Sequence, residues 1–157
     1  MKSRSALFLQ LAIGLIAAGV LAFLLWEPHL EGRNAHATTF EIYFKDPFLA
    51  DVYLGSTPFF VALHRAFRLL GHARRDGAFS PAIVEALRTI KRCAIALIGF
   101  VAVGVVLIIL FGDPDDRPAG FFMDFLVALA ATITAFAATS FARKLQQALG
   151  RPEGGRG

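Results

Sequence analysis

The sequence has 157 residues, of which 56% are hydrophobic and 18% are charged. Soluble domains average about 45–50% apolar and about 25% charged residues, so this composition argues against an ordinary soluble domain. The net charge is +4, but the basic residues lie between apolar blocks without an aromatic and basic recognition motif, which argues against a nucleic-acid partner. The apolar blocks are about 20 residues long, as in membrane-spanning helices, so we expect the lipid bilayer as the solvent.

The first apolar block predicts a membrane helix at 6–26. It follows Lys2 and Arg4, has Gln10 as its one polar side chain, and would span about 30 Å. Glu27-Pro28 predicts its end. The alternative is a signal peptide cleaved near Ala37, but the usual apolar core of such peptides is about 7–15 residues long, so we favour a retained helix.

The second block predicts a helix at 47–70 and is the most polar of the four. Its apolar part, Pro47 to Leu63, has only 17 residues and contains Asp51 and Pro58. Hydropathy alone would also allow a helix that lies at the membrane interface. Asp46-Pro47 has the pattern of an N-cap residue followed by proline at the first helical position.

The third and fourth blocks predict helices at 81–112 and 119–144. The stretch from Cys93 to Gly112 has no charged residue, and the fourth block contains Asp124 and stops at Arg143-Lys144. Each is long enough to cross the bilayer. We therefore expect one transmembrane domain at 1–145, followed by a disordered, glycine-rich tail at 146–157.

The distribution of Lys and Arg decides the expected topology, because these residues concentrate in cytoplasmic loops near helix ends. With four crossings and a cytoplasmic start, 13 of the 16 Lys and Arg residues face the cytoplasm. If the second block did not cross, the seven basic residues that follow it would have to be translocated. The sequence therefore predicts an all-α, multi-pass four-helix bundle in the inner (plasma) membrane, with the N-terminus and the C-terminus cytoplasmic.

Asp51 and Asp124 are the acids embedded in predicted spans, which makes them candidates for function. Both lie about 6–8 Å inside the expected outer boundary and near a helix N-terminus, where a carboxylate is favoured. We therefore favour a structural role at the interface. The alternative is that the two acids meet and form a proton or cation site, as in a small ion-coupled transporter or channel subunit.

The basic cytoplasmic junction, His64 to Arg92, is the largest exposed feature. Ser80-Pro81 predicts a helix start, and apolar residues recur at helical spacing from Ile83 to Ile90. This helix start is expected to rest on the membrane surface, or else to bind a cytoplasmic regulatory protein. Arg65 and Arg68 are expected to extend toward the headgroups. The candidate contact residues are Arg65, Arg68, Arg74, Arg75, Phe79, Ser80, Arg88, Lys91 and Arg92.

Small residues follow one face of the fourth predicted helix. This face predicts close helix packing within the chain or across a homo-oligomer, and it comprises Ala128, Thr132, Ala135 and Thr139, with Ala131 and Ala138 beside them. No catalytic, cofactor or metal-ligand motif is recognisable, so we expect neither an enzyme nor a bound cofactor.

The junction sequence DGAFSPAIVEALRTIKRCAIALIG resembles the bacterial membrane family called domain of unknown function 2975. That family has an apolar second helix, a Gly-Phe-Ser type turn, Leu-Arg and a hydrophobic third helix. The matching residues are Phe79, Ser80, Leu87, Arg88 and Ile90. The resemblance implies a four-helix inner-membrane protein, often encoded beside a small helix-turn-helix regulator. It favours a noncatalytic protein that contacts a regulatory partner or lipid headgroups through its basic loop.

Overall fold

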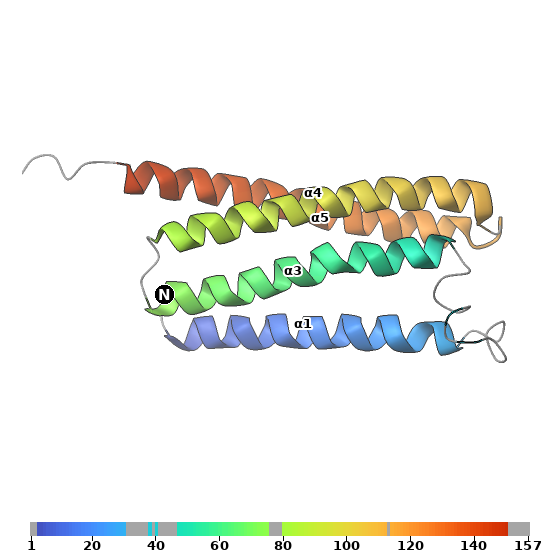
Figure 1. Ribbon diagram of the computed structural model, residues 1–157, viewed down its shortest axis with the longest axis horizontal. Coiled ribbons are helices and arrows are strands. Elements are labelled where there is room, and N and C mark those ends of the chain that lie inside the picture. The colour runs from blue at the N-terminus through green and yellow to red at the C-terminus, as the bar shows by residue number, and fades with distance from the viewer. Residues whose placement is uncertain are drawn as a thin grey trace, which may run out of the picture.

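The computed structural model describes residues 3–30, 38, 40, 47–75, 80–112 and 114–150. Four long helices make up the described chain, namely α1 (Ser3–Leu30), α3 (Pro47–Arg75), α4 (Pro81–Phe111) and α5 (Arg117–Leu149). They alternate in direction, so that Ser3 and Leu149 lie at the same end of the molecule (Figure 1). The predicted all-α fold is confirmed.

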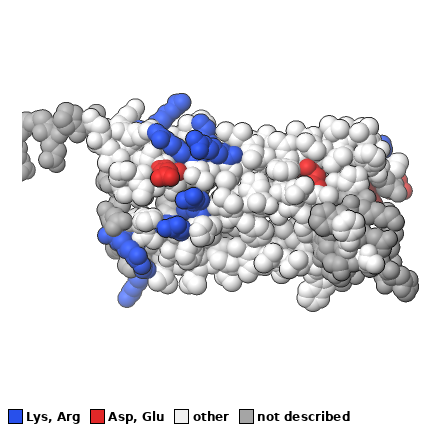
Figure 2. Space-filling model, viewed as in Figure 1, with Lys and Arg blue, Asp and Glu red and all other residues white. Residues whose placement is uncertain are grey.

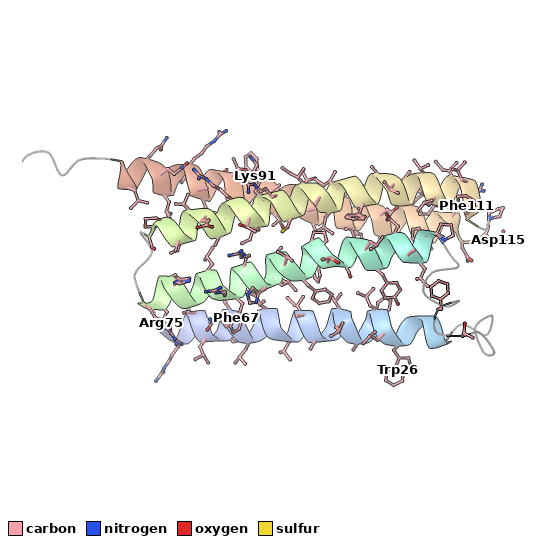
Figure 3. The ribbon with its side chains drawn as sticks, viewed as in Figure 1. Trp26, Phe67, Arg75, Lys91, Phe111 and Asp115 are labelled. Carbon is pink, nitrogen blue, oxygen red and sulfur yellow. The ribbon has the colours of Figure 1, made fainter. Side chains whose placement is uncertain are left out.

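We call the end that contains Ser3, Arg75, Pro81 and Leu149 the basic end, and the other the opposite end. Three helices are long and apolar enough to cross a membrane, namely α1 over Arg4–Trp26, α4 and α5. Trp26 is 67% exposed and points away from the bundle near the opposite end (Figure 3). An exposed indole at this position suits a membrane interface.

Helix α3 packs between α1 and α4, and α5 packs against α4. Helix α3 runs as one helix through Pro58. Two hydrogen bonds join it to α1. Near the basic end, Gln10 Nε2 donates to the Phe67 carbonyl at 3.1 Å. Near the opposite end, the Tyr53 hydroxyl donates to the Leu24 carbonyl.

The prediction that α1 ends at Glu27-Pro28 is wrong, because the helix continues to Leu30. Proline carries no backbone N–H, so Pro28 cannot bond the carbonyl four residues earlier, which belongs to Leu24. That carbonyl accepts the Tyr53 hydroxyl instead. The neighbouring helix thus satisfies the backbone group that the proline leaves unpaired.

Helix α4 begins as predicted, with Ser80 as N-cap accepting the Ala82 N–H at 3.3 Å and Pro81 at the first helical position. The prediction that the start of this helix rests on the membrane surface is wrong. Helix α4 is continuous, and Ile83, Val84 and Ile90 are buried within the bundle. The apolar stripe at its start is covered by the protein's own helices, not by the membrane surface.

Small residues line the contact between α4 and α5, but they are not the stripe that the sequence emphasised. Ala131, Ala138 and Ala142 are buried, whereas Thr132 is exposed. The hydroxyls of Thr132 and Thr139 each donate to the carbonyl four residues earlier at 2.7 Å. Ala131 and Ala138, which the sequence placed beside the predicted stripe, are therefore part of the buried face, whereas Thr132 of the stripe is not.

The predicted disordered tail begins too early. Residues 146–149 belong to α5, and the Gly150 N–H donates to the Gln146 carbonyl at 2.9 Å. Glutamine, alanine and leucine are good helix formers, which explains the extension. Residues 151–157, like the predicted N-cap Asp46, lie outside the described residues.

Gly55 allows α3 to approach α4 closely, because an added Cβ would lie 3.2 Å from Phe100 Cβ and Cγ. Gly55→Leu is expected to destabilise the protein by about 1–3 kcal/mol through overpacking. Gly99→Leu is the matched control, since nothing lies within 4 Å of its added Cβ. Thermal unfolding in detergent measures both, and equal losses would contradict this account of the α3–α4 contact.

Candidate functional site

Asp51 and Asp124 lie on different helices at the same level of the bundle. Asp51 is in the second turn of α3 and Asp124 in the second turn of α5, so both are about 6–10 Å from the opposite end. Gly104 of α4 lies two turns before the end of that helix. Because α4 packs against both α3 and α5, these three positions come together across helix boundaries.

The two carboxylates converge on Gly104. An added Cβ there would be 3.2 Å from Asp124 Oδ2 and 3.4 Å from Asp51 Oδ2. The two oxygens are therefore less than about 7 Å apart, the sum of these distances. Any larger residue at 104 would place a side chain against the acids. We call Asp51 and Asp124 the acid pair.

Asp124 is incompletely satisfied in this arrangement. Its Oδ2 atom is buried and has no hydrogen-bond partner among the described residues. The charge of Asp51 acts on the same carboxyl group. A buried carboxylate oxygen without a donor is costly, and a like charge nearby adds to the cost. A proton or a cation between the carboxylates would relieve both effects.

The acid pair borders a cavity of about 540 Å³ that all four helices line. From the acid pair the lining continues along the bundle to Ala66 of α3 and Ile90 of α4. Its walls are mostly apolar and include the rings of Phe23, Phe48, Phe59 and Phe100. The four-helix arrangement therefore leaves a partly open space between the helices, with an acidic end.

The sequence indicated the acids but not the glycine. Gly104 lies in the apolar run VAVGVVL, where a glycine has no visible role. A glycine inside an otherwise apolar helix often marks a close approach by another group, and this was the available signal. Which helix faces meet cannot be read from composition, so the meeting of the two acids was only an alternative before the structure.

Most of the described basic residues lie toward the basic end of the bundle, as Figure 2 shows for the visible face, whereas Arg117 lies at the opposite end. Arg65 lies ten residues before the end of α3 and Lys91 ten residues after the start of α4, so both are about 15 Å from the basic end. We call the residues near this level the basic belt; they are Arg65, Arg68, Arg88, Lys91, Arg92, Arg143 and Lys144.

None of the basic belt residues has an ion-pair partner among the described residues. Arg65 and Lys91 are partly buried and the other five are exposed. Arg74 and Arg75 are exposed at the end of α3. Ser80 acts as the N-cap of α4, while the predicted contact residue Phe79 lies outside the described residues.

Arg117 has a structural role that the sequence did not suggest. Its guanidinium donates to the Gly112 carbonyl through Nε and to the Ile109 carbonyl through Nη2, both at 3.2 Å. These carbonyls lie at the end of α4, where the last turn lacks helical partners. Arg117 thus caps α4 from the start of α5.

Comparisons with known proteins place the chain among membrane proteins of unknown function. The family model described as "Protein of unknown function (DUF2975)" matches residues 32–150. The "Uncharacterized membrane protein YoaS" of Bacillus subtilis (strain 168) is 29% identical over 150 residues, which cover 95% of this chain and 94% of that protein. No solved structure matches the chain. The resemblance seen at the junction is confirmed, and with three apolar helices the similarity indicates an integral membrane protein.

Replacing either member of the acid pair is expected to stabilise the protein, because each replacement removes a like charge. Asp51→Asn and Asp124→Asn should each raise the midpoint of thermal unfolding in detergent. The double variant should gain less than the sum, with a coupling of about 0.5–3 kcal/mol. Asp116→Asn, an exposed acid near the same end, is the control and should not couple to Asp51→Asn. Strict additivity for Asp51 and Asp124 would contradict their proximity.

Proposed function

The chain belongs to this family of proteins of unknown function, and we propose that it is a noncatalytic inner-membrane protein that works as a small ion-coupled transporter or channel subunit. In this proposal, a proton or cation binds between Asp51 and Asp124. The observation that carries the proposal is the convergence of the two carboxylates on Gly104, with Asp124 Oδ2 buried and unpartnered.

The packing of α3 supports a topology of four crossings with both termini in the cytoplasm. Helices α1, α4 and α5 have the length and hydropathy of membrane spans, and α3 lies alongside them over the same length. If the three apolar helices cross the bilayer, α3 crosses with them. Two of its polar residues, Asp51 and Ser56, line the cavity between the helices and are partly buried there.

The basic belt supports the orientation. From Pro47 to Arg65, α3 rises about 27 Å, close to the hydrocarbon thickness of about 30 Å. The belt would then lie at the cytoplasmic headgroups, as the positive-inside rule requires. The acid pair would lie in the outer third of the bilayer, within reach of ions from outside.

The electrostatic cost of two carboxylates at this depth can be lowered in two ways. Two carboxylates close together in an apolar cavity share a proton or hold a cation, because a bound proton or cation removes net negative charge. Exchange of one occupant for the other would couple the movement of a cation to that of a proton. This coupling is the chemical basis of the proposed activity.

A second candidate function is contact of the basic belt with anionic headgroups or a cytoplasmic regulatory partner. None of its cations has an ion-pair partner in the described part of the chain, which favours this role. It ranks second because the apolar stripe that the sequence offered for docking, Ile83 to Ile90, is largely buried within the bundle. The exposed residues that remain near the start of α4 include Glu85, Arg88 and Arg92.

Proteoliposomes that contain a pH-sensitive dye test the proposed function. An imposed Na⁺ or K⁺ gradient is expected to drive proton movement that exceeds the background of protein-free liposomes. Asp51→Asn and Asp124→Asn should each lower the rate by at least about tenfold. Asp116→Asn should retain the wild-type rate. Flux that is absent with both cations, or unchanged in the two acid-pair variants, would contradict the proposal.

A further inference from the structure

The cavity beside the acid pair is far larger than a proton or a simple metal ion needs. A single water molecule takes about 30 Å³ of liquid volume, whereas the cavity measures about 540 Å³. Sites for small organic ligands usually measure about 300–1,000 Å³. Its size therefore matches an organic molecule.

Among the described residues that line the cavity, the charge is of one sign only. Asp51 and Asp124 are the charged residues in this part of the lining, which includes no described lysine, arginine or histidine. The hydroxyls of Ser56 and Thr134, which also line it, donate to carbonyls of their own helices at 2.6 and 2.8 Å. The rest of the wall is aliphatic or aromatic. The matching ligand has a cationic group at one end and an apolar body.

The acid pair favours an organic ammonium over a resident metal ion. No group of three or more metal-ligating His, Cys, Asp or Glu side chains occurs among the described residues. Two carboxylates alone are few ligands for a divalent cation, whereas an ammonium group can donate one hydrogen bond to each of them. Asp124 Oδ2 is a buried acceptor that has no donor. Phenylalanine rings in the wall can contact the cation or its apolar body.

We propose that the cavity binds a lipophilic amine in its protonated form, with the ammonium group between Asp51 and Asp124 and the apolar body between α3, α4 and α5. The inference rests on the proposed function and names the substrate class of the same site. Exchange with a proton on the acid pair would release the amine.

Binding of 1-adamantylammonium and its neutral isostere 1-adamantanol tests the inference. The full chain in nanodiscs is titrated by calorimetry, with empty nanodiscs as the blank. The wild type is expected to bind the ammonium probe at least about tenfold more tightly than the alcohol. Asp51→Asn combined with Asp124→Asn should remove this difference. Equal affinity for the two probes in the wild type, or no binding of the ammonium probe above the blank, would overturn the inference.

Two further variants test whether the probe occupies the cavity. Ala130→Phe adds a ring to the cavity wall and should weaken binding of the ammonium probe by at least about tenfold. Ala102→Phe is the matched control on an exposed position of α4 outside the lining, and it should bind as the wild type does. Equal effects of the two variants would overturn the cavity as the binding place.

The failure of this inference can be told apart from the failure of the proposed function. If proton flux depends on the acid pair but the protein binds neither probe above the blank, the amine inference is wrong and the proposed ion site stands. Selective ammonium binding without acid-dependent proton flux, under a gradient of Na⁺, K⁺ or the ammonium probe itself, supports the amine site and contradicts the transport function.

Discussion

The position of α3 between α1 and α4 is the constraint on which the rest of the structure depends. Helix α3 carries an acid, a proline and a basic last third, so it lacks the hydropathy of an independent membrane span. Its neighbours compensate for this: α4 approaches it at Gly55, and α1 is tied to it by Gln10 and Tyr53. Neighbouring helices provide the polar partners and the small contact surfaces that lipid cannot provide.

The same packing creates the candidate site. Helix α4 has no side chain at Gly104, and the carboxylates of α3 and α5 occupy the space beside it. Helix α1 contributes part of the cavity wall but packs mainly on α3. A partly open space with an acidic end is therefore a product of the helix arrangement. The chemistry that we propose follows from this space: an unpartnered buried oxygen and a like charge favour a bound proton or cation.

The sequence predicted what depends on local rules. The four helices, the Ser80 N-cap and the grouping of basic residues at one end follow from hydropathy, capping preference and charge distribution. The meeting of Asp51 and Asp124 at Gly104 depends on helix rotation, which composition does not record. The end of α1 was predicted too early because Tyr53 of another helix bonds the carbonyl that Pro28 leaves unpaired. The stripe from Ile83 was assigned to the membrane surface because an amphipathic helix can bury its apolar face in lipid or in protein alike.

Cysteine accessibility in intact cells tests most directly whether α3 crosses the membrane in this orientation. Arg75→Cys and Asp115→Cys are introduced separately into the full chain with Cys93→Ser, since Cys93 is the one native cysteine. These positions lie at opposite ends of the bundle (Figure 3). A membrane-impermeant maleimide should label the Asp115→Cys variant from outside and the Arg75→Cys variant only after the cells are permeabilised. Labelling of the Arg75→Cys variant in intact cells would contradict the account.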